Sequence, residues 1–193
     1  MSRFLHPYFV VKEFIENQML TATQGGAPIV IVNPTACVGP WDLRERNLCF
    51  IPRLLRSEVP ISVQHIVNII DVRDVAVAIA AALETAQYGK PLLLSGQNLS
   101  IEALCSQICE IGGVQKPRLF LPASLSLLSS YVTELTLAVL GQRSPLPSLF
   151  AMLACEYEGV ESNGVHRTLG VIPRPLSETL QDAIGWYRRL GYC

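Results

Sequence analysis

The sequence predicts an α/β protein on two observations. Short runs rich in β-branched and other aliphatic residues alternate along the chain with longer segments that have helical periodicity. Half of the 193 residues are apolar and only 16% are charged, which is typical of parallel strands that are buried on both faces. A chain of this length can bury one sizeable core, or one domain together with part of another.

The first part of the chain is predicted to form a helix, a strand and a long loop. Apolar stripes predict a helix over 8–21, and Gly25 and Gly26 then break the chain. The β-branched run over 27–32 is typical of a central strand. The segment 35–52 is rich in Pro, Gly and Arg, so we expect loop there with at most one helical turn.

The middle of the chain is predicted to contain two buried strands and two helices. A short helix is expected over 52–57, followed by a strand over 61–72. Asp74 can cap an alanine-rich helix over 75–85. The apolar run 91–95 predicts a second buried strand.

The remainder of the chain has mostly helical periodicity. Ser100 can cap a helix that ends at Gly112 and Gly113. The other predicted elements are an extended piece over 118–121 and helices over 123–140, over 145–158 and from Ser177 onward, the last with an apolar stripe of Leu180, Ala183, Ile184 and Tyr187.

The charge distribution gives no case for a nucleic-acid or anionic-membrane partner. The formal net charge is −1, the isoelectric point is near 6.3 and the arginines are scattered. A membrane-spanning helix is not expected, because the two most apolar segments, 66–83 and 123–140, carry charged and hydroxyl side chains near their middles. The N-terminus does not open like a signal peptide, so we expect a cytoplasmic protein.

Neither the cysteines nor the acidic residues predict a metal site. The six cysteines form no Cys-x-x-Cys pair, and none has a histidine at ligand spacing. Cys105 and Cys109 share one helix face, and we interpret them as small buried apolar side chains rather than as a metal or redox pair. The glutamates of 156–161 and His166 could be drawn together as a metal cluster, but a solvated acidic loop is the preferred interpretation.

Tyr8 and Lys12 are the pair of residues with the clearest chemistry. Their four-residue spacing puts both side chains on one face of the predicted first helix. An ammonium group close to a phenol favours the ionised phenolate. Such a tyrosine can exchange a proton with a carbonyl or alcohol oxygen while hydride moves at the adjacent carbon. The pair is weak by itself, since an exposed helix pair without a catalytic role has the same spacing.

The order of the motifs after this pair resembles that of the extended short-chain dehydrogenase/reductases, the group of epimerases, dehydratases and dihydroflavonol reductases. After Tyr8 and Lys12 comes an apolar run that ends in Asn33-Pro34, and then 71–76, which precedes the alanine-rich helix. The resemblance covers nearly the whole chain. Its later segments are 93–96, 99–101, 167–170, 173–180 and 186–192.

The resemblance implies roles for four residues. Tyr8 would be the general acid/base, and Lys12 would be its partner and a contact to the ribose of NAD or NADP. Pro34 would form part of the wall of the nicotinamide site, so that it would bind the cofactor together with Tyr8 and Lys12. Asn33 would contact the substrate, although capping of the strand end is an equal alternative. The implied substrate is a small molecule with a carbonyl or alcohol group, such as a sugar nucleotide or a dihydroflavonol-like ketone.

The Gly-rich turn that holds the dinucleotide pyrophosphate does not occur in the sequence. The implied fold is the C-terminal portion of a Rossmann-type extended short-chain dehydrogenase/reductase, with the N-terminal nucleotide-binding half absent. Residues 1–98 would be the remnant of the Rossmann-type domain with the catalytic helix, and 99–193 a mostly helical substrate-binding lobe. We expect NAD or NADP to bind only if the missing half is supplied, and no activity of the chain alone.

Two functions from different classes therefore stay open. The chain is either the catalytic and substrate-binding part of an oxidoreductase or epimerase/dehydratase, completed by a separately encoded N-terminal half, or an inactive truncated remnant that serves as an interaction or dimerisation module. The resemblance also implies a homodimer formed through the helix that carries Tyr8 and Lys12. An unrelated α/β binding module would require the ordered resemblance to be a coincidence.

Overall fold

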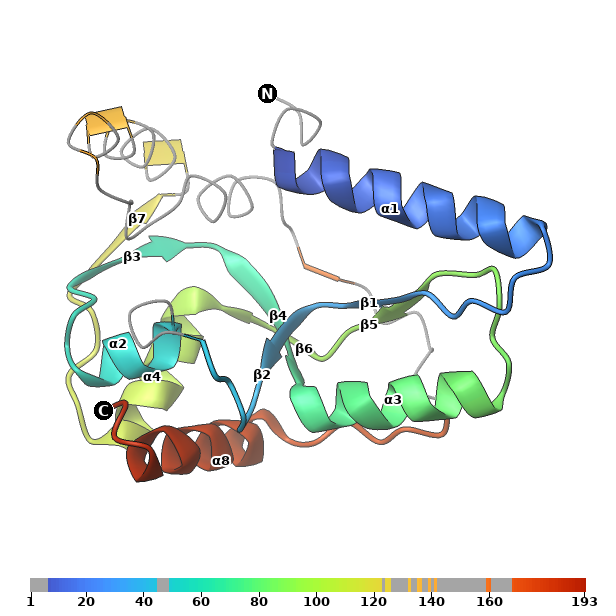
Figure 1. Cartoon of the computed structure of the whole chain (residues 1–193). Helices are drawn as coiled ribbons and strands as arrows, with labels where there is room; N and C mark the ends of the chain where they lie inside the picture. The colour runs from blue at the N-terminus through green and yellow to red at the C-terminus, as the bar shows by residue number, and fades with distance from the viewer. Residues whose placement is uncertain are drawn as a thin grey trace.

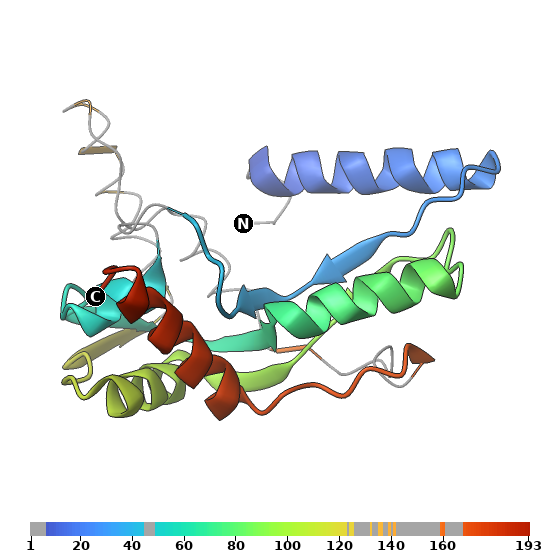
Figure 2. The same cartoon turned by 60° about the horizontal axis from the view of Figure 1, so that its bottom comes forward.

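The structure is a computed structural model that describes residues 7–44, 49–122, 159–160 and 168–193, together with a few positions between 124 and 141. Within these residues, short strands lie between helices (Figure 1). Figures 1 and 2 show α1 (Pro7–Gln24) and α3 (Val72–Glu84) on opposite sides of a central pair of strands. The α/β class predicted from the sequence is confirmed.

The central pair consists of β1 (Val32–Pro34) and β5 (Leu92–Leu94), which run parallel with Val32 opposite Leu92. Leu92 and Leu94 are buried, as expected for a strand between two layers of helices. The backbone amide of Thr35 donates to the carbonyl of Leu94 at 2.9 Å and so extends the pairing by one residue.

The two strands separate after this point, and a third strand enters between their continuations. β4 (Ile66–Asp71) pairs in parallel with β2 (Ala36–Val38) and antiparallel with β6 (Gln97–Ser100). β1 and β2 are thus successive segments of one extended path, as are β5 and β6. We call this branching of the sheet the fork.

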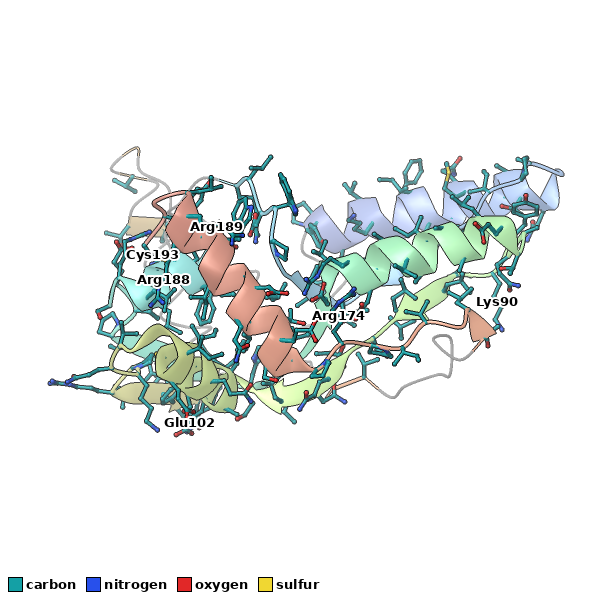
Figure 3. The ribbon with its side chains drawn as sticks, turned by 90° about the horizontal axis from the view of Figure 1, so that it is seen from below. Lys90, Glu102, Arg174, Arg188, Arg189 and Cys193 are labelled. Atoms are coloured by element: carbon teal, nitrogen blue, oxygen red, sulfur yellow. The ribbon has the colours of Figure 1, made fainter. Side chains whose placement is uncertain are left out.

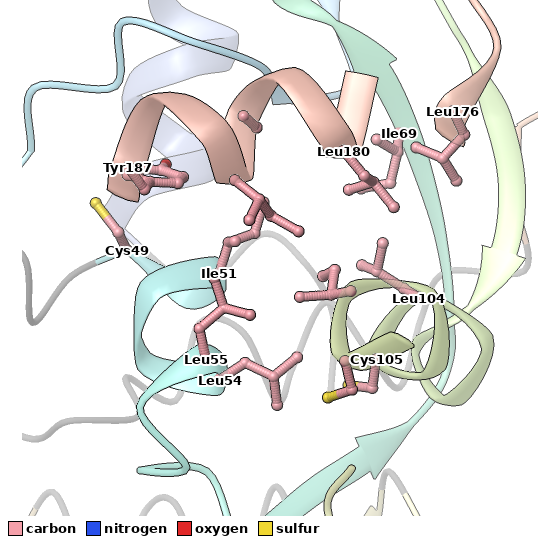
Figure 4. Close-up of a cluster of buried hydrophobic side chains, with 14 of the residues drawn as sticks. Cys49, Ile51, Leu54, Leu55, Ile69, Leu104, Cys105, Leu176, Leu180 and Tyr187 are labelled. Atoms are coloured by element: carbon pink, nitrogen blue, oxygen red, sulfur yellow. The ribbon is translucent and has the colours of Figure 1, made fainter. Parts of the chain in front are cut away.

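A further parallel pair and three helices complete the described fold. β3 (Ile61–Gln64) pairs in parallel with β7 (Leu119–Pro122). The helices are α2 (Phe50–Leu55), α4 (Ile101–Gly112) and α8 (Leu176–Arg189). They enclose the larger of two apolar cores (Figure 4), whose members include Leu54, Leu104, Cys105, Ile108, Leu180, Ala183 and Ile184. The smaller core lies under α3 and includes Ile70, Ala78, Ala82 and Leu94.

Several helix predictions are confirmed with their caps. The Ser100 hydroxyl accepts a hydrogen bond from the amide of Ala103 at 3.1 Å and begins α4, which ends at Gly113 with a φ of 69°. The predicted apolar stripe of α8 is buried, and Cys105 and Cys109 are buried apolar side chains of α4. The predicted helices over 123–140 and 145–158 lie mostly outside the described residues.

Other boundaries were wrong for identifiable reasons. The first strand covers 32–34 rather than 27–32. The segment 35–52 contains β2, which is only three residues long and mostly exposed, so it has no apolar run to reveal it. The predicted strand 61–72 is divided at His65, because β3 and β4 pair with different partners.

The capping prediction for Asp74 was also wrong. Asp71, not Asp74, caps α3, and its side chain accepts a hydrogen bond from the amide of Arg73 at 2.8 Å. Asp74 is buried in the first turn of the helix, where it accepts hydrogen bonds from the amide and the guanidinium of Arg174. A buried carboxylate needs such a partner, and the sequence could not show that one arrives from a residue 100 positions away.

Candidate functional site

α1 carries Tyr8 and Lys12 on an open surface. Tyr8 is 48% exposed, Lys12 is also exposed, and no residue of the helix is buried. The Lys12 ammonium nitrogen lies 5.8 Å from the centroid of the Tyr8 ring, within the range of a cation–π contact. The four-residue spacing therefore brings the two side chains together, as the sequence predicts.

A hydrogen bond ties this helix to the end of β1. Asn33 Nδ2 donates to Glu16 Oε2 at 2.8 Å, and Asn33 is half-buried between the strand and the helix. Pro34, the last residue of β1, is exposed. Figures 1 and 2 both show the N-terminal end of α1 directed toward the carboxyl end of β1. Tyr8, Lys12 and Pro34 are therefore exposed, and they belong to elements whose ends lie at the carboxyl edge of the strand pair, which is where open α/β sheets bind ligands.

The fork next to this edge is held by a buried polar network around Asn68 in β4. Asn68 is only 1% exposed. Its Oδ1 accepts from the Thr35 hydroxyl and from the Gly96 amide, each at 2.7 Å. Its Nδ2 donates to the Gly96 carbonyl at 3.2 Å and to Asn98 Oδ1 at 2.8 Å. Asn68 thereby bonds both paths of the sheet where they separate.

Asn98 carries this network into the C-terminal part of the chain. Its side chain donates to the carbonyl of Val160 at 2.8 Å and accepts from the amide of the same residue at 3.1 Å. These bonds link β6 to a segment more than 60 residues later. The sequence does not predict this network, although it contains one signal, an asparagine between the apolar residues of β4.

A second group of polar residues joins α3 to α8. Asp71 accepts from the guanidinium of Arg73 through both of its oxygens, at 2.9 and 2.6 Å, and from the Thr179 hydroxyl at 2.8 Å. Burial opposes ionisation of Asp71, but the hydrogen bonds from Arg73 and Thr179 outweigh it and hold the Asp71 pKa below its ordinary value. Arg73 also donates to Asp182 of α8 at 2.6 Å. This group fixes the helices rather than forming a reactive site.

The loop after β2 contains a third charged group. Asp42 accepts from the Arg44 guanidinium and from the Tyr187 hydroxyl, the latter at 2.9 Å. The hydrogen bond from Arg44 is the main cause that lowers the Asp42 pKa to about 2. Burial and the bond to Asp42 raise the pKa of Tyr187 above its ordinary value.

The described part of the chain contains no group of three side chains able to hold a metal ion. His166 and the glutamates of 156–161 lie outside the described residues, as does His6. His65 is shielded from water, which lowers its pKa. Within the described ranges, no helix combines the length and the apolar character needed to cross a bilayer.

The fold is that of the Rossmann-type epimerases and dehydratases. A nucleoside-diphosphate-sugar epimerase from Pseudomonas aeruginosa superposes with a TM-score of 0.76 at 24% identity, over 97% of this chain and 57% of that one. The solved structure of a protein designated gox2253 gives a TM-score of 0.74 at 28% identity, over 92% of this chain and 54% of that one. dTDP-glucose 4,6-dehydratase from Bacillus anthracis, solved in complex with NAD, gives a TM-score of 0.67 at 13% identity, over 96% of this chain and 53% of that one.

The sequence comparison agrees with the fold. A dihydroflavonol 4-reductase-like protein of Synechocystis is 31% identical over 200 aligned residues, which cover all of this chain and 57% of the relative. No family model matches the chain. In sequence and fold the chain is thus similar to part of the dihydroflavonol-reductase-like and epimerase/dehydratase proteins, which are extended short-chain dehydrogenase/reductases. It spans a little over half the length of the relatives that it matches.

Proposed function

We propose that the chain is the catalytic and substrate-binding part of an NAD(P)-dependent oxidoreductase or epimerase/dehydratase. The observation that supports this proposal most directly is the exposed Tyr8–Lys12 pair, with a Nζ-to-ring distance of 5.8 Å, on a helix that is hydrogen-bonded to β1. The substrate would be a carbonyl or alcohol compound, with a sugar nucleotide and a dihydroflavonol-like ketone as the two classes suggested by the relatives. Residues 1–98 would form the Rossmann-type part and 99–193 the substrate lobe.

Each predicted residue has a chemical task in this proposal. Tyr8 would give a proton to, or take one from, the oxygen of the reacting carbonyl or alcohol. Lys12 would stabilise the phenolate form of Tyr8 by its positive charge and would bond the ribose of the cofactor. Pro34 would present an apolar surface to the nicotinamide ring. Asn33 would contact substrate after exchanging its bond to Glu16, which holds the side chain at 2.8 Å in this structure.

The residues present fit one part of a nicotinamide cofactor. Tyr8, Lys12 and Pro34 are all exposed, so a ring and a ribose can reach them. The bound nicotinamide would supply or accept the hydride. The sequence contains no Gly-rich turn to hold the pyrophosphate, so residues outside these 193 would have to contribute that turn.

A binding titration tests this proposal. NADH and NADPH are each titrated into the full chain, alone and mixed with the N-terminal half of the Synechocystis relative, and cofactor fluorescence is followed. We expect saturable binding that Lys12→Ala weakens by about tenfold, equivalent to about 1.4 kcal/mol. Lys90→Ala is the matched control, since Lys90 is an exposed lysine in the turn before β5 (Figure 3). Absence of binding in both preparations, or equal weakening by the two variants, would refute a cofactor role for Lys12.

The exposed apolar side chains of α1 favour a second candidate, a module for dimerisation. Val10, Val11, Phe14 and Ile15 are between 48% and 63% exposed. An apolar surface of this kind marks an interface more often than a free face. Under this proposal, Phe14→Glu should convert a dimer to a monomer in sedimentation velocity runs. A wild-type chain that sediments as a monomer at all concentrations would rule it out.

A further inference from the structure

We propose that a groove between the loop after β2 and helix α8 binds a planar aromatic ring that carries one anionic group, a carboxylate or a phosphate. The groove has a volume of about 440 Å³ and is bordered by Trp41, Arg73, Asp182, Gly185, Trp186 and Arg189. Pockets for small organic ligands have volumes in this range. None of the bordering residues belongs to the site proposed around Tyr8, so the inference does not rest on the proposed function.

Trp41 provides an exposed aromatic wall. Its side chain is 77% exposed, and its ring centroid lies 6.5 Å from that of Trp186, which is buried and forms the floor. Trp41 has a φ of 72°, in the left-handed region that a bulky residue rarely adopts. Backbone strain of this kind clusters where a side chain must be presented to a ligand. The strain therefore holds a large aromatic surface in water, on which a planar ring can stack.

Gly185 keeps the groove open. It lies within α8 between residues whose side chains face the core, and a Cβ atom built at this position would meet no atom within 4 Å. Glycine is an unfavourable residue in the middle of a helix. No neighbouring atom would clash with a side chain at position 185. We therefore attribute the glycine to the open space that it leaves in the groove.

Among the described residues that border the groove, Arg189 is the cation available to a ligand. Arg73 is already bonded to Asp71 and Asp182. Arg189 is exposed and makes no ion pair with any residue that the structure describes. A guanidinium at the rim of an aromatic wall recognises a carboxylate or a phosphate on a stacked ring.

The next residue of the same helix provides a matched control. Arg188 donates to the carbonyl of Gly112 at 2.7 Å and does not border the groove. Figure 3 shows Arg188 and Arg189 on different sides of α8. The two arginines therefore differ in their access to the groove while they share charge, helix and sequence context.

The test uses the fact that the chain contains two tryptophans and that both border the groove. Chain labelled with ¹⁵N is titrated with 2-naphthoate, and separately with AMP, while the two indole Nε1–H resonances are followed by NMR. We expect saturable shifts of at least one indole resonance with at least one of the two probes. The probe that binds more tightly identifies the preferred anionic group. The neutral analogue 2-naphthylmethanol should bind more weakly than 2-naphthoate.

The variants decide whether the groove is responsible. Arg189→Gln should weaken binding by about fivefold, the size expected for one partly exposed charge pair. Arg188→Gln should bind the probe with an affinity within about twofold of wild type, because Arg188 makes no ion pair with a ligand in the groove. Gly185→Leu should abolish binding while the circular dichroism melting curve shows a folded chain. No shift with either probe, equal effects of the two arginine variants, or undiminished binding by folded Gly185→Leu would overturn the proposal.

Discussion

The Thr179 hydroxyl of α8 donates a hydrogen bond of 2.8 Å to Asp71, the residue that caps α3, although the two lie 108 positions apart in the chain. Both side chains are buried, at 4% exposure for Asp71 and 1% for Thr179. One carboxylate thus satisfies the helix terminus, the Arg73 guanidinium and a hydroxyl of the C-terminal helix. The Asp71 side chain therefore links the end of β4, the start of α3 and α8.

Substitution of Thr179 and substitution of Asp71 should both destabilise the chain, and the Asp71 variant should lose more stability. Thr179→Val leaves Asp71 with one acceptor site unpaired and should lower the free energy of unfolding by about 1–3 kcal/mol. Asp71→Ala also removes the cap and the partner of Arg73 and should cost about 3–5 kcal/mol. Urea denaturation measures both. Asp182→Asn is the control, because Asp182 is 46% exposed in its side chain and should contribute less than about 1 kcal/mol. Equal costs for all three variants would contradict this assignment.

The polar network at the fork gives a second prediction. Asn68→Ala should lower the free energy of unfolding by about 3 kcal/mol, since it leaves the partly buried Gly96 amide without its acceptor and opens a cavity in β4. Hydrogen exchange should then accelerate at the Gly96 amide more than in α4, which makes none of the Asn68 hydrogen bonds. Uniform acceleration across both regions would show that the network has no local role.

Two glycines should respond to alanine in opposite directions. A Cβ atom at Gly96 would lie 1.9 Å from the carbonyl oxygen of Ile69, so Gly96→Ala must displace backbone and should cost about 3 kcal/mol or more. Gly185→Ala meets no atom within 4 Å and should stabilise the chain by about 0.5–1 kcal/mol through helix propensity. The melting temperatures of the two variants should therefore move to opposite sides of the wild-type value.

The Asp42–Arg44 pair in the loop after β2 predicts that the stability of the chain depends on pH in the acid range. The Asp42 pKa is lowered to about 2 by the Arg44 guanidinium, whereas the pKa of an aspartate in an unfolded chain is about 3.9. A lowered native pKa contributes stability that is complete above the unfolded value and is lost as the pH falls toward the native one. The stability difference between wild type and Asp42→Asn should thus be constant above about pH 4 and shrink between about pH 4 and pH 2. A difference that does not change over this interval would contradict the prediction.

The sequence by itself determined the α/β class, the relatives and the helices with strong local signals. α1, α4 and α8 were predictable because periodicity, caps and glycine ends are local properties of neighbouring residues. The juxtaposition of Tyr8 and Lys12 follows from helix geometry alone. The roles proposed for Tyr8, Lys12, Asn33 and Pro34 come from the family resemblance and stay predictions until they are measured.

Only the tertiary structure decided the features that depend on residues far apart in the chain. β2 and β6 are short and mostly exposed, and they are strands because β4 enters between them. Asp71 rather than Asp74 caps α3. The Asp71 carboxylate also accepts hydrogen bonds from Arg73 and Thr179, and Asp74 instead accepts hydrogen bonds from Arg174 of the C-terminal segment. The groove at Trp41 exists because a loop and a helix that are separated by more than 100 residues meet there. Hydrogen bonds and packing between distant segments have no local pattern, so folding alone brings these partners together.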